Sequence, residues 1–432
     1  MDWLVDCFDT IYFENSRNGL TRPKSVRGEG YKMINMGELY RYDRLWNPEM
    51  ELVPLSTSEI EKYSLKNGDL LFARQSLVLE GTGKCSIVMS APEITCFESH
   101  LIRVRLDKQI ADPLFYYYYF SSPQGKDNVQ SLVMQVAAAG IRGSELAKLK
   151  IPVPSLLTQR KIAAILSAYD DLIETNLRRI KILEEMAQNL YREWFVNFRF
   201  PGHGQTRFVD YPPGQIPEGW EFSTLGEQLI ALESGKRPKG GIKDINCGIP
   251  SIGAENIDGI GRHNYQKEKY VPVDFFNSMK TGKVKDRDVG LYKDGAYIGK
   301  STYFRDGFPH DILCINEHVF LLRSNNRTMT QNQLYLWLQE SSTVSGIRAT
   351  NANAAQPGIN QNSIRGLQIT IAPEKVVLDF DNLVNPLLAQ VINLAKRNLT
   401  LSQTRDLLLS RLISGEVNVS GLDIKVPEEV AI

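Results

Sequence analysis

One stretch of this sequence comes close to a phosphate-binding loop. GAYIGKST, residues 295–302, contains Gly-Lys-Ser, as does the loop that cradles nucleotide phosphates. That loop requires four residues between its glycines, because consecutive backbone N–H groups must wrap around the phosphate, and here only three separate Gly295 from Gly299. GTGKCS, residues 81–86, carries a second Gly-Lys pair between short apolar runs. We therefore interpret both pairs as hairpin turns and expect no nucleotide site.

The other reactive residue types show no catalytic or metal-binding pattern. The five cysteines are scattered without C-x-x-C spacing, and the five histidines have no metal-ligand spacing to cysteine or acidic neighbours. Motifs of serine hydrolases, zinc peptidases and dinucleotide-binding enzymes are absent from the sequence. We expect reduced structural cysteines, no metal and no catalytic residue in this chain, which argues against an enzyme.

Several polar side chains have a structural interpretation instead. His100 and His318 each lie in a β-type run, where an interior histidine with satisfied hydrogen bonds is favoured over a catalytic base. The acidic pairs Asp170-Asp171 and Glu184-Glu185 fall in a helical stretch, where a solvated charged face is expected.

One aromatic run, FYYYYF at residues 115–120, could form a base-stacking platform for a single strand. Asp112 and Pro113 precede it and are typical of a helix N-cap and first turn. We therefore expect a short helix whose aromatic side chains pack in the core.

The sequence repeats itself at an offset of 218 residues. GIRGSELAKLKIPVP, residues 140–154, corresponds to GINQNSIRGLQITIA, residues 358–372, and His100 falls on His318. A unit of roughly 215 residues is far longer than a solenoid repeat of about 20 to 50 residues, so each copy should be a domain with its own core. We predict a tandem duplication, and two similar domains suggest two similar roles.

Each copy divides into a mixed part and a helical part. The first 150 or so residues alternate β-type runs such as GDLLFA and HLIRVRL with Gly, Pro and Asn, which indicates an α+β domain. The second part, from Thr158 to Phe198, has neither Gly nor Pro and would span about 60 Å as one helix.

Apolar residues repeat with heptad spacing along this helix and its copy, which predicts two seams that pack on each other as an antiparallel coiled coil. Asn176, Asn398 and Arg405 are polar seam positions that would set register, or alternatively face solvent at a frayed crossing. Pro386 predicts that the second helix is kinked or begins there. The predicted seam consists of Ile162, Leu166, Tyr169, Ile173, Asn176, Ile180, Leu183, Leu190, Val384, Leu387, Val391, Leu394, Leu401 and Leu408.

Length and composition agree with a soluble globular protein of two to three domains, since 42% of the 432 residues are hydrophobic. We find no membrane-span run and no signal peptide, and expect a cytoplasmic chain. The net charge is zero, which argues against coating nucleic acid by bulk attraction. Two local stretches, residues 16–32 and 234–243, are nevertheless basic and lie about one repeat apart.

Three parts of the sequence, taken together, resemble a known protein family. IPVPSLLTQRKIAAILSAYDDLIETNLRRIKILEEMAQNLYREWF, a second globular half and a second helix closing with LLLSRLISGEV resemble the specificity subunit of a Type I restriction-modification system. The resemblance covers nearly the whole chain. It departs from the pattern at Pro386 and at Ala372-Pro373, where the first copy has Val153-Pro154.

The resemblance implies five segments, two of them target recognition domains. These are residues 1–155 (first target recognition domain), 156–200 (first spacer helix), 201–373 (second target recognition domain), 374–415 (second spacer helix) and 416–432 (C-terminal tail). Each domain would read one half of a split double-stranded DNA target, and the helices would fix the gap at about one helical turn.

The resemblance also implies partners that hold the activities. Two adenine methyltransferase subunits would use S-adenosylmethionine, restriction subunits would use ATP and Mg²⁺, and this chain would bind no cofactor itself. A scaffold that binds only proteins through two modules remains an alternative, distinguished by the absence of salt-dependent DNA binding. An enzyme comes third and would need turnover by the isolated chain.

Basic loops flanked by Gly and Pro can reach phosphates, and arginine can read guanine through a bidentate bond in the major groove. Solvated loop charge is the alternative for each residue. The expected DNA contacts are Arg17, Arg22, Lys24, Arg27, Lys236, Arg237, Lys239 and Lys243.

Overall fold

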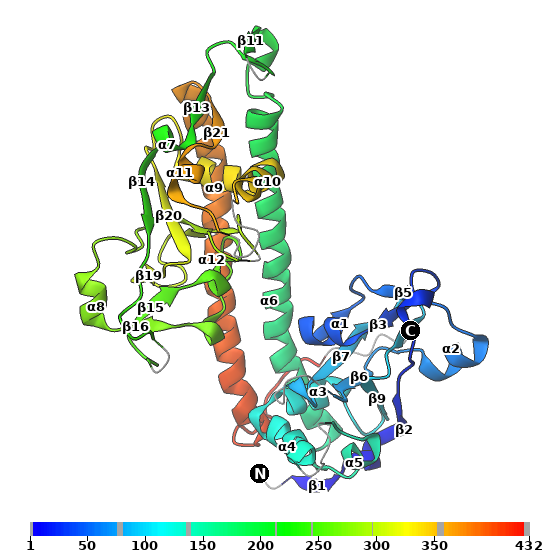
Figure 1. Ribbon diagram of the computed structural model, residues 1–432. Helices are drawn as coiled ribbons and strands as arrows, with labels where there is room; N and C mark the ends of the chain where they lie inside the picture. The colour runs from blue at the N-terminus through cyan, green and yellow to red at the C-terminus, as the bar shows by residue number, and fades with distance from the viewer. Residues whose placement is uncertain are drawn as a thin grey trace. The chain divides into compact units, whose positions relative to one another are not determined.

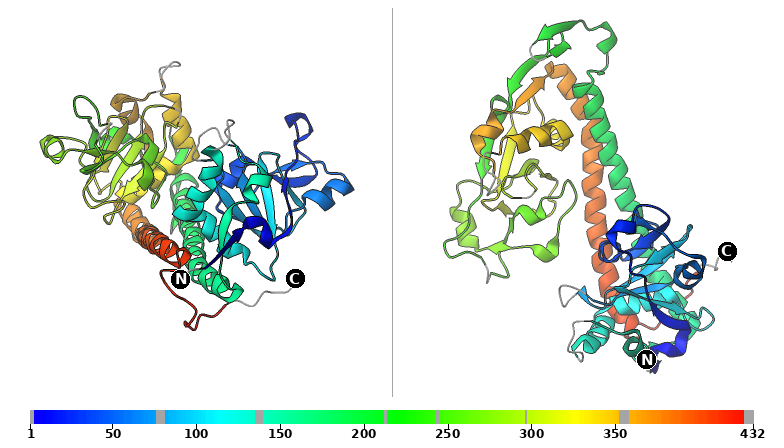
Figure 2. Two further views of the ribbon diagram at one scale, coloured as in Figure 1. Left: turned by 90° about the horizontal axis from the view of Figure 1, so that it is seen from below. Right: turned by 45° about the vertical axis from the view of Figure 1, so that its right-hand side comes forward.

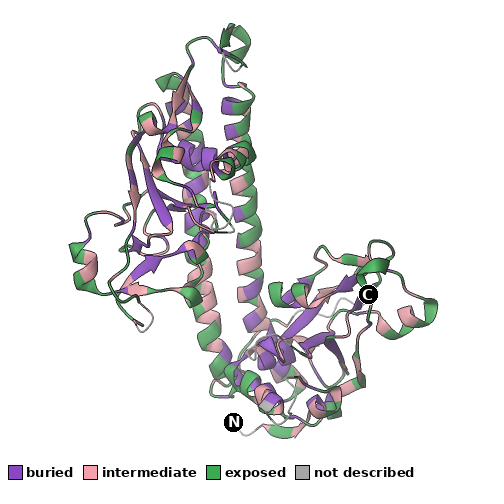
Figure 3. Ribbon diagram, viewed as in Figure 1, coloured by how far each residue is buried: buried purple, intermediate pink, exposed green. Residues whose placement is uncertain are grey.

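The computed structural model describes residues 3–75, 81–134, 140–211, 214–242, 245–295, 297–351 and 358–426. The chain forms two compact units (Figure 1). Unit 1 contains Met1–Asp171 together with Leu401–Ile432, and unit 2 contains Leu172–Thr400. Each unit has its own hydrophobic core, and the buried residues concentrate on the strands and on the helices that cover them (Figure 3).

Unit 1 is an α+β domain. Its strands are β1 Leu4–Cys7, β2 Tyr12–Asn18, β3 Tyr31–Ile34, β4 Arg44–Trp46, β5 Glu51–Val53, β6 Leu70–Ala73, β7 Cys85–Ser90, β8 Thr95–Phe97, β9 Leu101–Leu106 and β10 Lys150–Val153. Its helices are α1 Met36–Arg41, α2 Thr57–Tyr63, α3 Pro113–Ser121, α4 Pro123–Met134 and α5 Gly143–Leu146, and α6 Leu156–Tyr191 begins in it.

The main sheet of unit 1 has the strand order β2-β9-β6-β7-β4, and a smaller sheet has the order β5-β3-β8. Helix α3 packs on the main sheet because its aromatic residues are all buried, with Phe120 at 5.0 Å from Phe72 between ring centroids. Asp112 caps the helix by accepting a hydrogen bond from the N–H of Phe115 at 2.9 Å. The predicted cap and the predicted core packing are confirmed.

Unit 2 is also an α+β domain. Its strands are β11 Phe208–Tyr211, β12 Gly214–Pro217, β13 Glu221–Thr224, β14 Leu229–Ser234, β15 Ile249–Ile252, β16 Tyr270–Val271, β17 Asp288–Tyr292, β18 Ser301–Phe304, β19 Cys314–Ile315, β20 Val319–Ser324 and β21 Gln368–Ile371. Its shorter helices are α7 Leu225–Gln228, α8 Val273–Ser278, α9 Gln331–Gln339, α10 Ser341–Ala349 and α11 Gln361–Arg365.

The main sheet of unit 2 has the order β14-β20-β17-β18, and its smaller sheet has the order β16-β15-β19. The two Gly-Lys pairs occupy similar places in the two units. Gly83 precedes β7, which is antiparallel to β6, and Gly299 precedes β18, which is antiparallel to β17. Both glycines have a left-handed backbone, which agrees with the predicted turns.

The long helices are α6, which ends in a single π turn at Arg192–Val196, and α12 Glu374–Ile413. Helix α12 continues through Pro386, so the alternative that it begins there is wrong. Within unit 2 the two helices run side by side (Figure 2). None of the fourteen seam residues is exposed, but Leu388, Ile392 and Leu409 outside the seam are buried as well.

The polar seam residues are paired inside the units. In unit 2 the Asn176 amide donates to the Asn398 Oδ1 at 2.8 Å, and in unit 1 the Arg405 guanidinium lies 2.5 Å from Asp170. The proposed solvated face is therefore wrong for Asp170, which is 6% exposed and also accepts a hydrogen bond from the Tyr118 hydroxyl at 2.6 Å. The prediction failed because a helix that packs on a domain as well as on another helix has more than one buried face.

Both histidine predictions are also wrong, because neither side chain is interior. His100 is exposed in the turn before β9, and His318 is 40% exposed in the turn before β20, with its Nδ1 3.2 Å from Asp294. A β-type run of residues does not reveal where the strand starts, and each histidine falls one residue before it.

Candidate nucleic-acid interface

The first basic stretch begins where β2 ends in unit 1. Gly19 follows the strand and lies against the backbone of β8, so that a Cβ atom here would collide with the carbonyl oxygens of Phe97 and Glu98. Only glycine allows this approach. The chain then crosses to a short 3₁₀ turn at Lys24–Val26 before entering β3.

Two arginines of this stretch are held by carboxylates. The Arg22 guanidinium lies 2.6 Å from Glu59 and donates to the carbonyl oxygen of Pro54. The hydrogen bond from Arg22 to the Glu59 carboxylate is the main reason that the pKa of Glu59 falls to about 2. Arg27 pairs with Glu51 and donates to the carbonyl oxygen of Arg22 at 2.9 Å. Both side chains remain partly exposed, so the loop presents them in fixed positions.

The other predicted residues of this half differ in their surroundings. Lys24 is exposed, and within the described residues it has no ion pair. Arg17 lies in β2 rather than in a loop, and its guanidinium is 5.9 Å from the ring centroid of Tyr63. The prediction that Arg17 belongs to a flexible basic loop is therefore wrong, because β2 extends through this residue.

The second basic stretch begins where β14 ends in unit 2, with a similar arrangement. Gly235 lies against the backbone of β19, and a Cβ atom here would collide with the carbonyl oxygen of Ile315. Lys236, Arg237 and Lys239 are all exposed, and of these Arg237 forms an ion pair with Glu317 at 2.8 Å. Lys243 lies outside the described residues.

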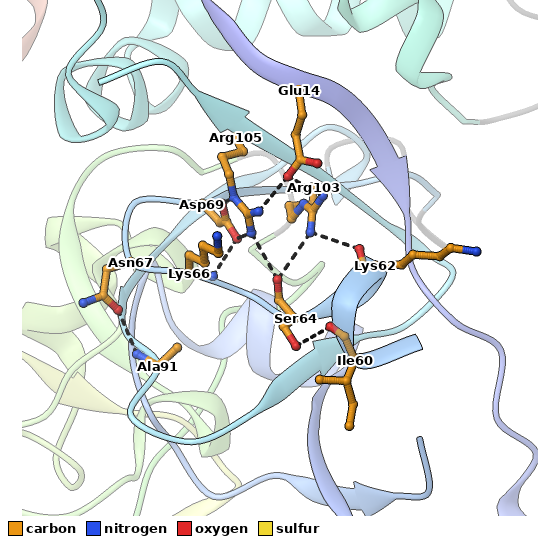
Figure 4. A network of polar contacts seen from close by, with 10 residues as sticks. All are labelled: Glu14, Ile60, Lys62, Ser64, Lys66, Asn67, Asp69, Ala91, Arg103 and Arg105. Atoms are coloured by element: carbon orange, nitrogen blue, oxygen red, sulfur yellow. Dashed lines mark hydrogen bonds and ion pairs between the residues drawn. The ribbon is translucent and has the colours of Figure 1, made fainter. Parts of the chain in front are cut away.

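A buried ion network holds the strand that leads into the first basic stretch (Figure 4). Arg105 on β9 makes two bonds of 2.7 Å to the buried carboxylate of Asp69 and one of 2.6 Å to Glu14 on β2. Arg105 also donates to the carbonyl oxygen of Ser64, and Arg103 donates to Glu14 at 2.9 Å. Since bidentate arginine bonds fix geometry, the network ties β2 to the sheet interior.

Unit 2 contains a corresponding network. Arg323 on β20 makes bonds of 2.6 and 2.7 Å to Asp288, pairs with Glu233 on β14, and donates to the carbonyl oxygen of Lys283. Despite this partner, burial raises the pKa of Asp288.

Sequence inspection missed both networks, although the repeat contains the signal. Arg105 and Arg323 are 218 residues apart, and Glu14 and Glu233 are 219 apart. Charged residues repeated inside apolar strands indicate a buried structural pair.

The structure brings together three residues that sequence spacing did not single out. His263, Glu268 and His310 place their ligand atoms within 4.8 Å of one another. The spacing gave no signal because the fold brings His310 to Glu268 from 42 residues away. Among the described helices, none is long and apolar enough to cross a membrane.

Three comparisons relate the chain to known proteins. Residues 15–185 match the family described as Type I restriction modification DNA specificity domain. The Type I restriction enzyme MjaIX specificity subunit of Methanocaldococcus jannaschii is 26% identical over 316 residues, which cover 71% of this chain and 70% of the relative. The EcoKI specificity subunit of Escherichia coli K12 is 28% identical over 172 residues, which cover 39% of this chain and 36% of the relative.

A solved structure has a related fold. The crystal structure of the S subunit of a Type I restriction-modification system from M. genitalium superposes with a TM-score of 0.56 at 16% identity, over 95% of this chain and 96% of that chain.

Proposed function

We propose that this chain, which carries a Type I restriction-modification DNA specificity domain and resembles specificity subunits over most of its length, reads a split DNA target. As a non-catalytic recognition component, it would direct adenine methylation and restriction by partner subunits. The match of residues 15–185 to the DNA specificity domain is the observation that carries the proposal. Acting on cellular DNA, the chain would work in the cytoplasm.

A tandem duplication explains why two half-sites would be read. Its support is the shared topology of the units, since β2-β9-β6-β7 in unit 1 corresponds to β14-β20-β17-β18 in unit 2. The Arg105 and Arg323 networks and the glycines at the start of each basic stretch add chemical detail to this correspondence. Each unit would then recognise its own short block of base pairs.

The helices would act as the spacer between the two half-sites. Support for antiparallel packing comes from the order of the contacts, because residues further along α6 meet residues earlier in α12. Asp170 pairs with Arg405, Asn176 with Asn398, and Tyr191 lies 6.2 Å from Phe380 between ring centroids. A coiled coil of this kind would fix the gap at about one turn of the duplex. The boundaries of the five predicted segments belong to the same proposal.

The exposed lysines and the paired arginines would have different roles in DNA binding. Lys24, Lys236 and Lys239 would contact phosphates, whose attraction is independent of sequence. Arg22, Arg27 and Arg237 would need to exchange a carboxylate for a phosphate or a guanine edge, which makes their contacts conditional on a close fit. Loop arginines that must leave a partner therefore suit discrimination better than bulk affinity.

Partner subunits would complete the DNA-binding surface and supply the chemistry. A chain with no net charge is expected to bind DNA weakly at moderate salt, so two methyltransferase subunits would clamp the duplex. They would use S-adenosylmethionine, restriction subunits would use ATP and Mg²⁺, and this chain would bind none of these.

Sequencing of modified adenines in cells that carry the methyltransferase partner, with and without this chain, tests the proposal. We expect a motif of two short blocks to be methylated only when the chain is present. Active partner subunits with no methylation that depends on this chain would instead favour a scaffold that binds only proteins.

The loop assignment is tested in the assembled methyltransferase complex. Lys236→Ala with Lys239→Ala should make the negative slope of log K against log salt shallower by about 0.9 for each lost phosphate contact. Lys181→Ala with Lys375→Ala, two exposed lysines on the long helices, is the matched control and should leave the slope unchanged. Equal slopes for both double variants would remove these lysines from the interface.

A further inference from the structure

Two loops of unit 2 bring three ligand-type side chains to one point. His263 lies before the 3₁₀ turn Tyr265–Lys267, Glu268 follows that turn, and His310 lies between β18 and β19. The Nε2 of His263 is 2.6 Å from the Oε1 of Glu268, and the Nε2 of His310 contacts the same oxygen. Two imidazoles thus converge on one carboxylate oxygen.

The surroundings hold these groups in place. The Tyr270 hydroxyl donates to the other oxygen of Glu268 at 2.8 Å, which leaves Oε1 for the histidines. The ring of Tyr265 packs edge-on against both imidazoles, with centroid distances of 4.6 Å to His263 and 5.7 Å to His310. Such second contacts are what orient the ligands in metal sites.

The carboxylate of the cluster is buried and is held by two imidazoles and a tyrosine hydroxyl. The side chains of His263 and Glu268 are only 2% and 6% exposed. Within the described residues Glu268 has no ion pair with an arginine or lysine, and the adjacent Lys269 pairs with Glu255 instead. A buried carboxylate is costly without a cation, because the protein interior solvates charge weakly. A bound divalent cation would neutralise this carboxylate and take both imidazoles as neutral ligands.

We propose that His263, Glu268 and His310 bind a divalent transition-metal ion of the Zn²⁺ class through Nε2, Oε1 and Nε2. This site goes beyond the proposed DNA recognition and does not rest on it. Zinc takes histidine nitrogen and carboxylate oxygen at about 2.0–2.2 Å, so tetrahedral ligand atoms lie roughly 3.3 Å apart. Small rotations of the side chains away from their present contacts create that spacing.

The cluster is accessible from one side. His310 is 31% exposed and also lines a surface pocket with Asp286, Asp306 and Asp311, which provides a path for a cation. Three protein ligands leave the fourth tetrahedral position to water.

The ion would act as a structural cross-link. Glu268 leads into β16, and the chain after His310 leads into β19, the two outer strands of the order β16-β15-β19. Joining their preceding loops fixes both edges of this small sheet, so binding should raise the stability of unit 2.

Zinc titration of the full-length, tag-free chain tests the site. All proteins carry Cys247→Ser, because this exposed thiol could bind zinc by itself. After EDTA treatment and dialysis, we expect one Zn²⁺ per chain by isothermal calorimetry and a higher thermal midpoint. Glu268→Gln, which keeps the shape of the side chain but removes its negative charge, should weaken binding about 100-fold or more and abolish the zinc-dependent shift.

Matched variants separate loss of the site from loss of the fold. His310→Asn alters the most exposed ligand and should also abolish binding, while His203→Asn, an exposed histidine of the same unit, should not. Circular dichroism in EDTA checks that each variant is folded. Zinc binding weaker than about 10 µM in the parent chain, or equal binding by folded Glu268→Gln and His310→Asn, would overturn the proposal.

Discussion

Arg323→Ala should destabilise unit 2 strongly, because it removes the partner of a buried carboxylate. The side chain of Asp288 is only 2% exposed, and Arg323 donates a short hydrogen bond to each of its two carboxylate oxygens. Removing one partner of a buried ion pair costs about 3–5 kcal/mol. For a unit of this size, 1 kcal/mol corresponds to roughly 2–4 °C, so the midpoint should fall by about 6–20 °C.

The cost should depend on the charge left behind. Asp288→Asn added to Arg323→Ala replaces the unpaired carboxylate by a neutral amide, so the double variant should recover most of the lost stability. Arg323→Lys keeps a positive charge without the bidentate geometry and should lie between the parent and Arg323→Ala.

Hydrogen exchange followed by mass spectrometry assigns the loss to a unit. Peptides of β17 and β20 should exchange faster in Arg323→Ala, with those of β6 and β9 unchanged. Arg105→Ala should give the opposite pattern, with a smaller effect on β2, because Arg103 still pairs with Glu14. A cost of less than 1 kcal/mol, or no recovery with Asp288→Asn, would refute the assignment of the network as a structural pair.

Three further perturbations test other features. Burial raises the pKa of Cys96 and of Cys314 to about 11, so their contribution to stability is complete below pH 9 and is lost toward pH 11. Urea midpoints from pH 8 to 11 should therefore fall less steeply in the Cys96→Ala/Cys314→Ala chain, and equal slopes would contradict these shifts. Asn176→Leu should cost about 1–3 kcal/mol by leaving the amide of Asn398 unpaired, whereas changing both residues to leucine should restore or raise the urea midpoint. Gly235→Ala should lower the thermal midpoint of unit 2, since its Cβ meets backbone, and an unchanged midpoint would show that the loop shifts freely.

The helices could be predicted from the sequence more readily than the candidate nucleic-acid interface. Heptad spacing located both long helices, and Asp112-Pro113 located the start of α3 within one residue. These signals are local, since caps and periodicity act between residues that are close in the chain. The repeat at offset 218 also predicts two similar domains, and the shared strand orders support our proposal of a duplication.

The candidate site was harder, because its geometry depends on residues far apart in sequence. Arg22 forms an ion pair with Glu59, and Arg237 forms one with Glu317. Neither partner can be identified from a basic stretch alone. Asp170 was assigned to a solvated surface because the partners Tyr118 and Arg405 lie 52 and 235 residues away. A sequence pattern contains information about neighbouring residues only, so it does not reveal ion pairs between residues that are far apart in the chain.

Unit 1 is closed by the last part of the chain. Leu409, Leu412 and Ile413 belong to its core, and the buried ammonium of Lys161 donates to the carbonyl oxygens of Ser420 and Leu422 at 2.9 and 2.7 Å. On the ribosome, unit 1 therefore cannot complete its core until residues 409–422 have been synthesised, which is after all of unit 2. A chain cut after residue 400 would leave the apolar surface that Leu409, Leu412 and Ile413 cover open to solvent. The unit that begins first along the chain is thus the last to be completed.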